Sequence, residues 1–155
     1  MPHLSFDSPL GFLTLHEDSG ALIALDWGRA PGGVASPLLA AAKAQVEAYF
    51  AGRRRSFELP LRPLGTDFQK SVWRAMRAIP FGRTRSYGDL ARDLASAPRA
   101  VGGACGKNPL PLLIPCHRVL GARGALGGYS GGDGLDTKRR LLAHEARIAK
   151  ADPAS

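Results

Sequence analysis

Residues 98–119, PRAVGGACGKNPLPLLIPCHRV, carry the features from which the fold of this chain is inferred. Pro98 suits the first position of a helix, and Ser86 with Asp89 marks the start of a shorter helix before it. Two short helices joined by a tight turn predict a helix-turn-helix, in which the second helix is the one that enters a groove of DNA.

The second of these helices carries few side chains, because Ala100, Gly102, Gly103 and Ala104 make up most of it. Glycine costs a helix about 1 kcal/mol relative to alanine, so the bare surface needs a reason. Close approach of the backbone to DNA is one explanation. Tight packing on a neighbouring helix is the other, and the residues alone leave both open.

Cys116 follows the apolar residues 112–114, which we expect to form a buried strand, and it directly precedes His117. A cysteine is a strong nucleophile as the thiolate, which a neighbouring base promotes. A carboxylate that fixes the imidazole completes such a relay, and Glu145 is the best candidate for it. The alternative is that Cys116 is a small buried hydrophobic residue with no chemical role.

Two other chemistries could use these residues. Cys105, Cys116, His117 and His144 could form a Cys2His2 zinc site, but structural zinc ligands are usually paired two to four residues apart. We therefore predict no metal. A cysteine hydrolase would explain Cys116 and His117, but it would explain neither the helix-turn-helix nor the basic charge of the central segment.

The residues before this region predict a small α/β domain, residues 1–62. Two short apolar runs, 11–15 and 21–25, are separated by a turn and predict an antiparallel hairpin. Ser36 and Pro37 start a helix that ends at Gly52. Residues 59–65 contain two prolines and predict a linker.

Residues 63–155 predict a second, mostly helical domain of the winged helix-turn-helix type. Thr66 and Gln69 form a capping box at the start of its first helix. A glycine-rich loop spans residues 121–134, and Leu141, Leu142 and Ile148 mark a last helix. The apolar stripe of the first helix, expected in the core, comprises Phe68, Val72, Met76 and Ile79.

The positive charge indicates either a nucleic-acid partner or a solvated basic surface, and composition alone leaves both interpretations open. The chain has 155 residues, a formal net charge of +8 and a pI near 10.2, and a pI above about 9 is typical of nucleic-acid binders. Residues 70–118 hold nine basic and two acidic side chains, a net charge of +7. No apolar run is long enough to span a bilayer and no signal peptide is evident. We therefore expect a cytoplasmic protein without a disulfide.

Beyond these patterns, the chain resembles the alkylguanine-DNA alkyltransferases, also called methylated-DNA–protein-cysteine methyltransferases. The segment Ile114-Pro115-Cys116-His117-Arg118-Val119 is similar to the active-site motif of that family. The resemblance is strong over residues 66–148 and weak over residues 1–60. Further segments that match in order and spacing are 68–69, 72–73, 79–82, 84–87, 90–91, 99–104, 108–109, 128–132, 141–142 and 144–145.

The resemblance implies a single-turnover repair reaction on duplex DNA, with no cofactor and no membrane, carried out by a monomer. Cys116 would accept an alkyl group from the six-position oxygen of guanine, and alkylated thymine is a second candidate substrate. His117 would be the base, directly or through a water, and Glu145 would orient it. Asn108 would hold the helix-turn-helix against the active-site segment.

The same resemblance implies a set of DNA contacts. Arg99 would enter the duplex and fill the space left by a flipped guanine. The bare helix at Ala100, Gly102 and Gly103 would press into the minor groove. Arg118 is counted among the DNA-binding residues as well.

The flipped base would be bound by residues from three segments. Tyr87 would stack near the rotated phosphate and hydrogen-bond the base, while Tyr129 and Ser130 would wall the pocket. The carbonyl of Val119 would bind the guanine amino group. Lys138 matches a family lysine, although extra residues between Ser130 and Lys138 depart from the family pattern.

A binding protein without transfer activity is the alternative function. Such a protein would recognise alkylated DNA and mark it for another pathway. The presence of both Cys116 and His117 argues against it.

Overall fold

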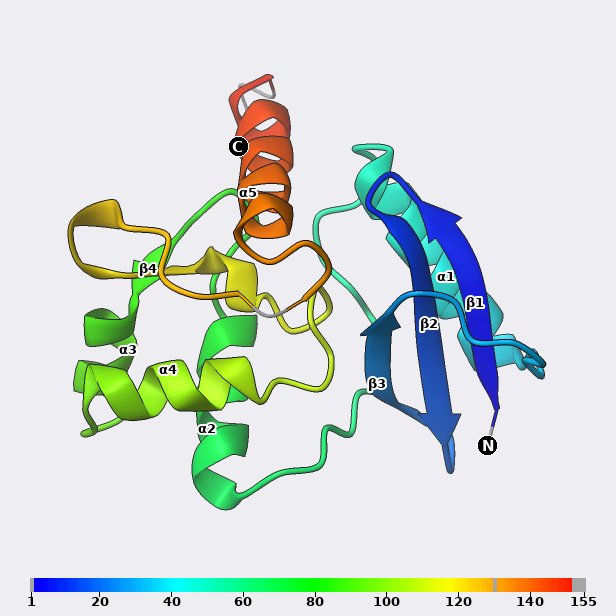
Figure 1. The fold of residues 1–155 in the computed structure, drawn as a ribbon, viewed down its shortest axis with the longest axis horizontal. Helices are drawn as coiled ribbons and strands as arrows, with labels where there is room; N and C mark the ends of the chain where they lie inside the picture. The colour runs from blue at the N-terminus through cyan, green and yellow to red at the C-terminus, as the bar shows by residue number, and fades with distance from the viewer. Residues whose placement is uncertain (1, 130, 152–155) are drawn as a thin grey trace. The chain divides into compact units, whose positions relative to one another are not determined.

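The computed structural model describes residues 2–129 and 131–151. The chain forms two compact units, Met1–Leu64 and Gly65–Ser155 (Figure 1). Each unit is built around its own buried side chains.

The first unit is a three-stranded antiparallel sheet with one helix. Strands β1 (His3–Ser8), β2 (Gly11–Asp18) and β3 (Ala21–Trp27) lie in the order β1-β2-β3. Helix α1 (Pro37–Phe50) packs on β1 and β2, and Ser36 caps it as predicted, with its side chain accepting a hydrogen bond from the Leu39 amide at 3.1 Å. The predicted hairpin is therefore confirmed as β2 and β3, and β1 extends it by one strand.

The second unit is mostly helical. Its helices are α2 (Asp67–Arg77), α3 (Tyr87–Asp93), α4 (Pro98–Gly106) and α5 (Leu135–Ala151). Two-residue strands β4 (Arg85–Ser86) and β5 (Val119–Leu120) pair in parallel. Short 3-10 helices η1 (Cys116–Arg118) and η2 (Ala122–Gly124) complete the unit.

Helices α3 and α4 form the predicted helix-turn-helix. Ser86 and Asp89 make a full capping box at the start of α3, and α4 begins at Pro98. Helix α4 also packs against α2, where the buried Trp73 indole donates to the Ala104 carbonyl at 2.9 Å. Together with the first unit, this arrangement confirms the predicted fold class.

Two local predictions were wrong. Residues 112–114 are buried but do not form a strand, because Leu112 has a φ of +73° and turns the chain. Phe68 is 37% exposed, whereas Val72, Met76 and Ile79 are buried as expected. Phe68 lies in the first turn of α2 and stays partly exposed, whereas Trp73, further along the helix, is buried in the core.

Candidate active site

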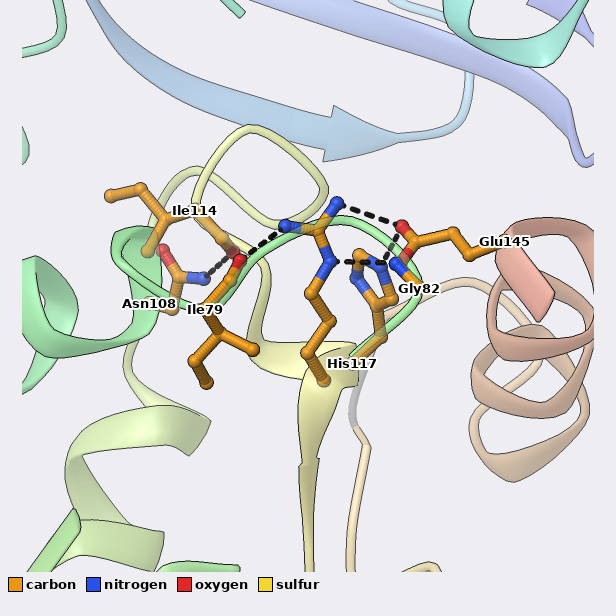
Figure 2. Close-up of polar contacts among 7 residues, drawn as sticks. Ile79, Gly82, Asn108, Ile114, His117 and Glu145 are labelled. Atoms are coloured by element: carbon orange, nitrogen blue, oxygen red, sulfur yellow. Dashed lines mark hydrogen bonds and ion pairs between the residues drawn. The ribbon is translucent and has the colours of Figure 1, made fainter. Parts of the chain in front are cut away.

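Cys116 opens the 3-10 helix η1 directly after Pro115, and its side chain is 9% exposed. Asn108, in the loop after α4, holds the backbone segment that precedes this cysteine. Its side-chain amide donates to the Ile114 carbonyl at 2.9 Å, and its oxygen accepts from the Leu110 amide at 3.0 Å (Figure 2). Asn108 thus links the end of the helix-turn-helix to the residues just before Cys116.

His117 and Glu145 are brought together from η1 and α5. The Nε2 atom of His117 lies 2.7 Å from Oε2 of Glu145, and both side chains are almost completely buried (Figure 2). An ionised carboxylate can only accept, so Nε2 carries the hydrogen. In the neutral ring Nδ1 then keeps its lone pair, and this buried atom has no hydrogen-bond partner among the described residues.

The Glu145 carboxylate also binds Arg118 and the turn after α2. Arg118 donates from Nε to Oε1 at 2.8 Å and from Nη2 to Oε2 at 3.0 Å. The Gly82 amide donates to Oε1 at 3.2 Å. Burial alone would raise the pKa of Glu145, but hydrogen bonds from His117 and Arg118 and the positive charge of Arg118 lower it overall. Glu145 is therefore ionised.

This arrangement argues against the expected contact of Arg118 with DNA. The side chain is 7% exposed, and its remaining Nη1 donates to the Ile79 carbonyl at 2.7 Å. Its guanidinium carbon lies 5.7 Å from the centre of the Phe81 ring, a cation–π arrangement. All three guanidinium nitrogens thus donate to buried protein oxygens.

The thiol of Cys116 is protonated at rest. Burial raises its pKa, while a hydrogen bond from the Asn108 side chain and the positive charge of Lys138 partly oppose this. A protonated thiol needs a base at the moment of reaction, and the unprotonated Nδ1 of His117 belongs to the adjacent residue.

Lys138 lies inside the unit and holds the loop that follows β5. Its side chain is fully buried, and Nζ donates to the carbonyls of Val119 at 2.7 Å, Gly128 at 3.4 Å and Leu126. Burial lowers its pKa. Lys138 therefore positions backbone carbonyls of the loop that follows β5.

Two tyrosines lie close to Cys116 and the Lys138 loop. Burial, together with the nearby cysteines, raises the pKa of the half-buried Tyr87. Its ring packs so closely on Gly127 that an added Cβ there would come within 2.8 Å of it. Burial and the adjacent Cys116 raise the pKa of Tyr129. Ser130 lies outside the described residues.

The exposed face of α4 is bare for a reason other than packing. Arg99, Ala100 and Gly103 are exposed, and an added Cβ at Gly103 would meet no described atom within 4 Å. Gly102 faces the Tyr87 ring, with 4.0 Å between an added Cβ and the nearest ring atoms. Close packing thus does not account for the glycine at position 103.

Sequence reasoning missed two parts of the site. The Gly82 amide and the Arg118 guanidinium both act on Glu145, more than 25 residues away along the chain. Gly82 has a φ of +77°, so a glycine after Ile79-Pro80-Phe81 was the available signal for a special turn. For Arg118 the signal was its place beside Cys116 and His117.

Within residues 2–129 and 131–151, no group of three or more His, Cys, Asp or Glu side chains could hold a metal ion. The residues of the alternative zinc site are thus not gathered in one cluster. A search of the same residues finds no helix with the length and hydropathy needed to cross a membrane.

The fold and site define a protein with a buried cysteine, an oriented histidine base and a helix face open to DNA. Comparison with known families agrees with this class. Residues 67–147 match the model of the 6-O-methylguanine DNA methyltransferase DNA-binding domain, and residues 3–63 match that of the ribonuclease-like domain of the same proteins. The chain belongs to the methylated-DNA–protein-cysteine methyltransferase family.

Individual relatives cover nearly the whole chain. The methylated-DNA–protein-cysteine methyltransferase of Methanosarcina acetivorans is 41% identical over 94% of this chain and 98% of its own. That of Mycolicibacterium paratuberculosis is 46% identical over 94% of this chain and 92% of its own. The crystal structure of Mycobacterium tuberculosis OGT in complex with DNA is 42% identical with a TM-score of 0.85, covering 96% of this chain and 94% of that one.

Proposed function

We propose that this protein repairs alkylated DNA by transferring the alkyl group from the six-position oxygen of guanine to Cys116. The observation that carries this proposal is the 2.7 Å His117–Glu145 pair next to the buried cysteine. The relatives that match most of the chain are named as methyltransferases of this kind, so the alternative of a damage-marking protein is not favoured.

The reaction is a single displacement at the alkyl carbon, with guanine as the leaving group. His117 takes the thiol proton at Nδ1, directly or through one water, and the thiolate attacks the alkyl carbon. The sulfur–carbon bond forms as the carbon–oxygen bond breaks, and guanine leaves as an anion that takes up the proton held by His117, directly or through water. The product is a thioether on Cys116, which has no easy route back, so each molecule reacts once.

The alkylated base must leave the stack to reach a buried thiol, because an atom inside a duplex is inaccessible to such a site. We assign this step to α4, with Arg99 filling the vacated space and Ala100, Gly102 and Gly103 lying in the minor groove. Backbone approach needs a surface without side chains, which the exposed Gly103 provides.

The remaining residues would bind the flipped base. Tyr87 and Tyr129 would bracket it. The Val119 carbonyl, which accepts from Lys138, keeps a second lone pair for the guanine amino group. Lys138 acts through the loop carbonyls that it holds, and Asn108 through the segment before Cys116.

We also propose that residues 63–155 carry DNA binding and transfer, whereas residues 1–62 form a separate domain. We further propose that the protein acts as a monomer. A cytoplasmic location fits a substrate that is chromosomal duplex DNA.

Mass spectrometry tests the proposal directly. After incubation with a duplex that contains O6-methylguanine, we expect one methyl group on the peptide that contains Cys116. Cys116→Ser should gain none, whereas the matched variant Cys105→Ala should react as the wild type does, because burial raises the pKa of Cys105 to about 12 and leaves it inert. Tight lesion binding without added mass would favour the damage-marking alternative.

A further inference from the structure

Arg118 is a buried cation with an arrangement that the proposed reaction does not yet explain. It makes two hydrogen bonds to Glu145, at 2.8 and 3.0 Å, and a third to the Ile79 carbonyl at 2.7 Å. Its side chain is 7% exposed and lies over the Phe81 ring. Burying a guanidinium carries a large desolvation penalty, so a role limited to packing is a poor explanation.

The charges around His117 clarify what Arg118 does. Glu145 faces the ring from α5, Arg118 and Cys116 flank it in η1, and Lys138 adds a second cation from α5. His144, the neighbour of Glu145, faces the Phe81 ring instead, with ring centres 6.5 Å apart. The bidentate Arg118 contact offsets the charge of Glu145, so His117 faces an ion pair and not an isolated anion.

We propose that Arg118 is a positioning residue that keeps Glu145 ionised and His117 uncharged, with Nδ1 ready to take the proton of Cys116. This inference rests on the proposed alkyl transfer and assigns to Arg118 a part in its proton step. An isolated buried carboxylate would bind a proton itself or hold one on His117. In the second case Nδ1 would already carry a hydrogen and could not act as the base.

The pKa shifts of His117 and Glu145 both have the direction that this role requires. Burial, followed by the positive charges of Arg118 and Lys138, lowers the pKa of His117, although Glu145 opposes this. Arg118 and His117 together lower the pKa of Glu145 against the effect of burial. Removing the cation should therefore raise the proton affinity of the Glu145–His117 pair.

The first test compares single-turnover transfer rates of wild type, Arg118→Met and Arg118→Lys on a duplex with O6-methylguanine. For Arg118→Met, we expect the ratio of variant to wild-type rate to rise with pH, approaching tenfold per pH unit below the apparent pKa of the pair. Arg118→Lys keeps the charge, so its ratio should be nearly independent of pH. A constant ratio for Arg118→Met would show a purely structural role and overturn the proposal.

The second test does not depend on whether Arg118→Met folds. Nitrogen-15 NMR of labelled histidines in the wild type should show His117 as the neutral Nε2–H tautomer at neutral pH, with the signal assigned by its loss in His117→Phe. A doubly protonated ring would overturn the proposal. If the wild type transfers no methyl group at all, the proposed function fails. That outcome is distinguishable from a wild type that transfers the group while the rate ratio of Arg118→Met stays constant with pH.

Discussion

The exposed face of α4 and the buried cluster at Glu145 belong to the same unit but differ in how many contacts their residues make. On α4, an added Cβ at Gly103 would meet nothing described within 4 Å. At Glu145, four donor groups from two segments converge on one carboxylate, with distances from 2.7 to 3.2 Å. A helix surface without side chains allows another molecule to approach its backbone closely. A buried charge, by contrast, is stable only when it is fully hydrogen-bonded.

The largest expected effect comes from removing the base in the buried cluster. His117→Phe leaves the Arg118–Glu145 pair in place but removes the proton acceptor, so transfer should slow by about 10²- to 10⁴-fold. Because His117 is completely buried, binding to duplex DNA measured by fluorescence anisotropy should be unchanged. A large loss of DNA binding would mean that the two regions are not separable.

Arg99→Ala tests the exposed face of α4 and should leave the chemistry at Cys116 unchanged. Filling the gap left by the flipped base offsets an unstacking cost of a few kcal/mol, so transfer from duplex should fall about tenfold or more. Reaction with free O6-methylguanine should be nearly unaffected, since it has no stack to open. The matched control is Arg92→Ala on α3, an exposed arginine whose partner is Asp89 at 2.7 Å. Equal losses on duplex and free base would contradict the role of Arg99.

Asn108→Ala should have a moderate effect on stability and a smaller one on rate. It removes two hydrogen bonds of a half-buried side chain, which should lower the free energy of unfolding by about 1–3 kcal/mol. Asn108 also opposes the raised pKa of Cys116, so the variant thiol should ionise at higher pH. Denaturant unfolding and the pH dependence of thiol alkylation measure the two effects. An unchanged thiol pKa would limit Asn108 to a structural role.

The smallest effect on stability should have the opposite sign. Gly103→Ala adds a methyl group in open space, so it should stabilise the isolated protein by about 0.5–1 kcal/mol through helix propensity. The same methyl group should weaken binding to duplex DNA, and Gly103→Leu should weaken it further. Gly106→Ala, also open but at the end of α4, is the control. Unchanged affinity in Gly103→Leu would place the DNA elsewhere.

Local signals predicted the parts of this protein that depend on neighbours in the chain. The caps at Ser36, Thr66 and Ser86 set the helix starts, because each side chain binds an amide only three residues away. Residues 112–114 were mistaken for a strand, since an apolar run indicates burial but not φ, and Leu112 turns at +73°. The apolar stripe of the first helix predicts Phe68 in the core, but periodicity does not show how far along a helix the neighbouring elements pack.

The sequence by itself determined that Cys116 and His117 are adjacent, that the central segment is basic and that α4 is bare, because these are properties of consecutive residues. Only the tertiary structure decided what surrounds them. Glu145 lies 28 residues after His117, and Gly82 lies 63 residues before Glu145, yet all three meet. The resemblance implies that Arg118 contacts DNA, whereas the structure buries its side chain against Glu145. Hydrogen-bond partners depend on distances across the fold, and no local pattern encodes them.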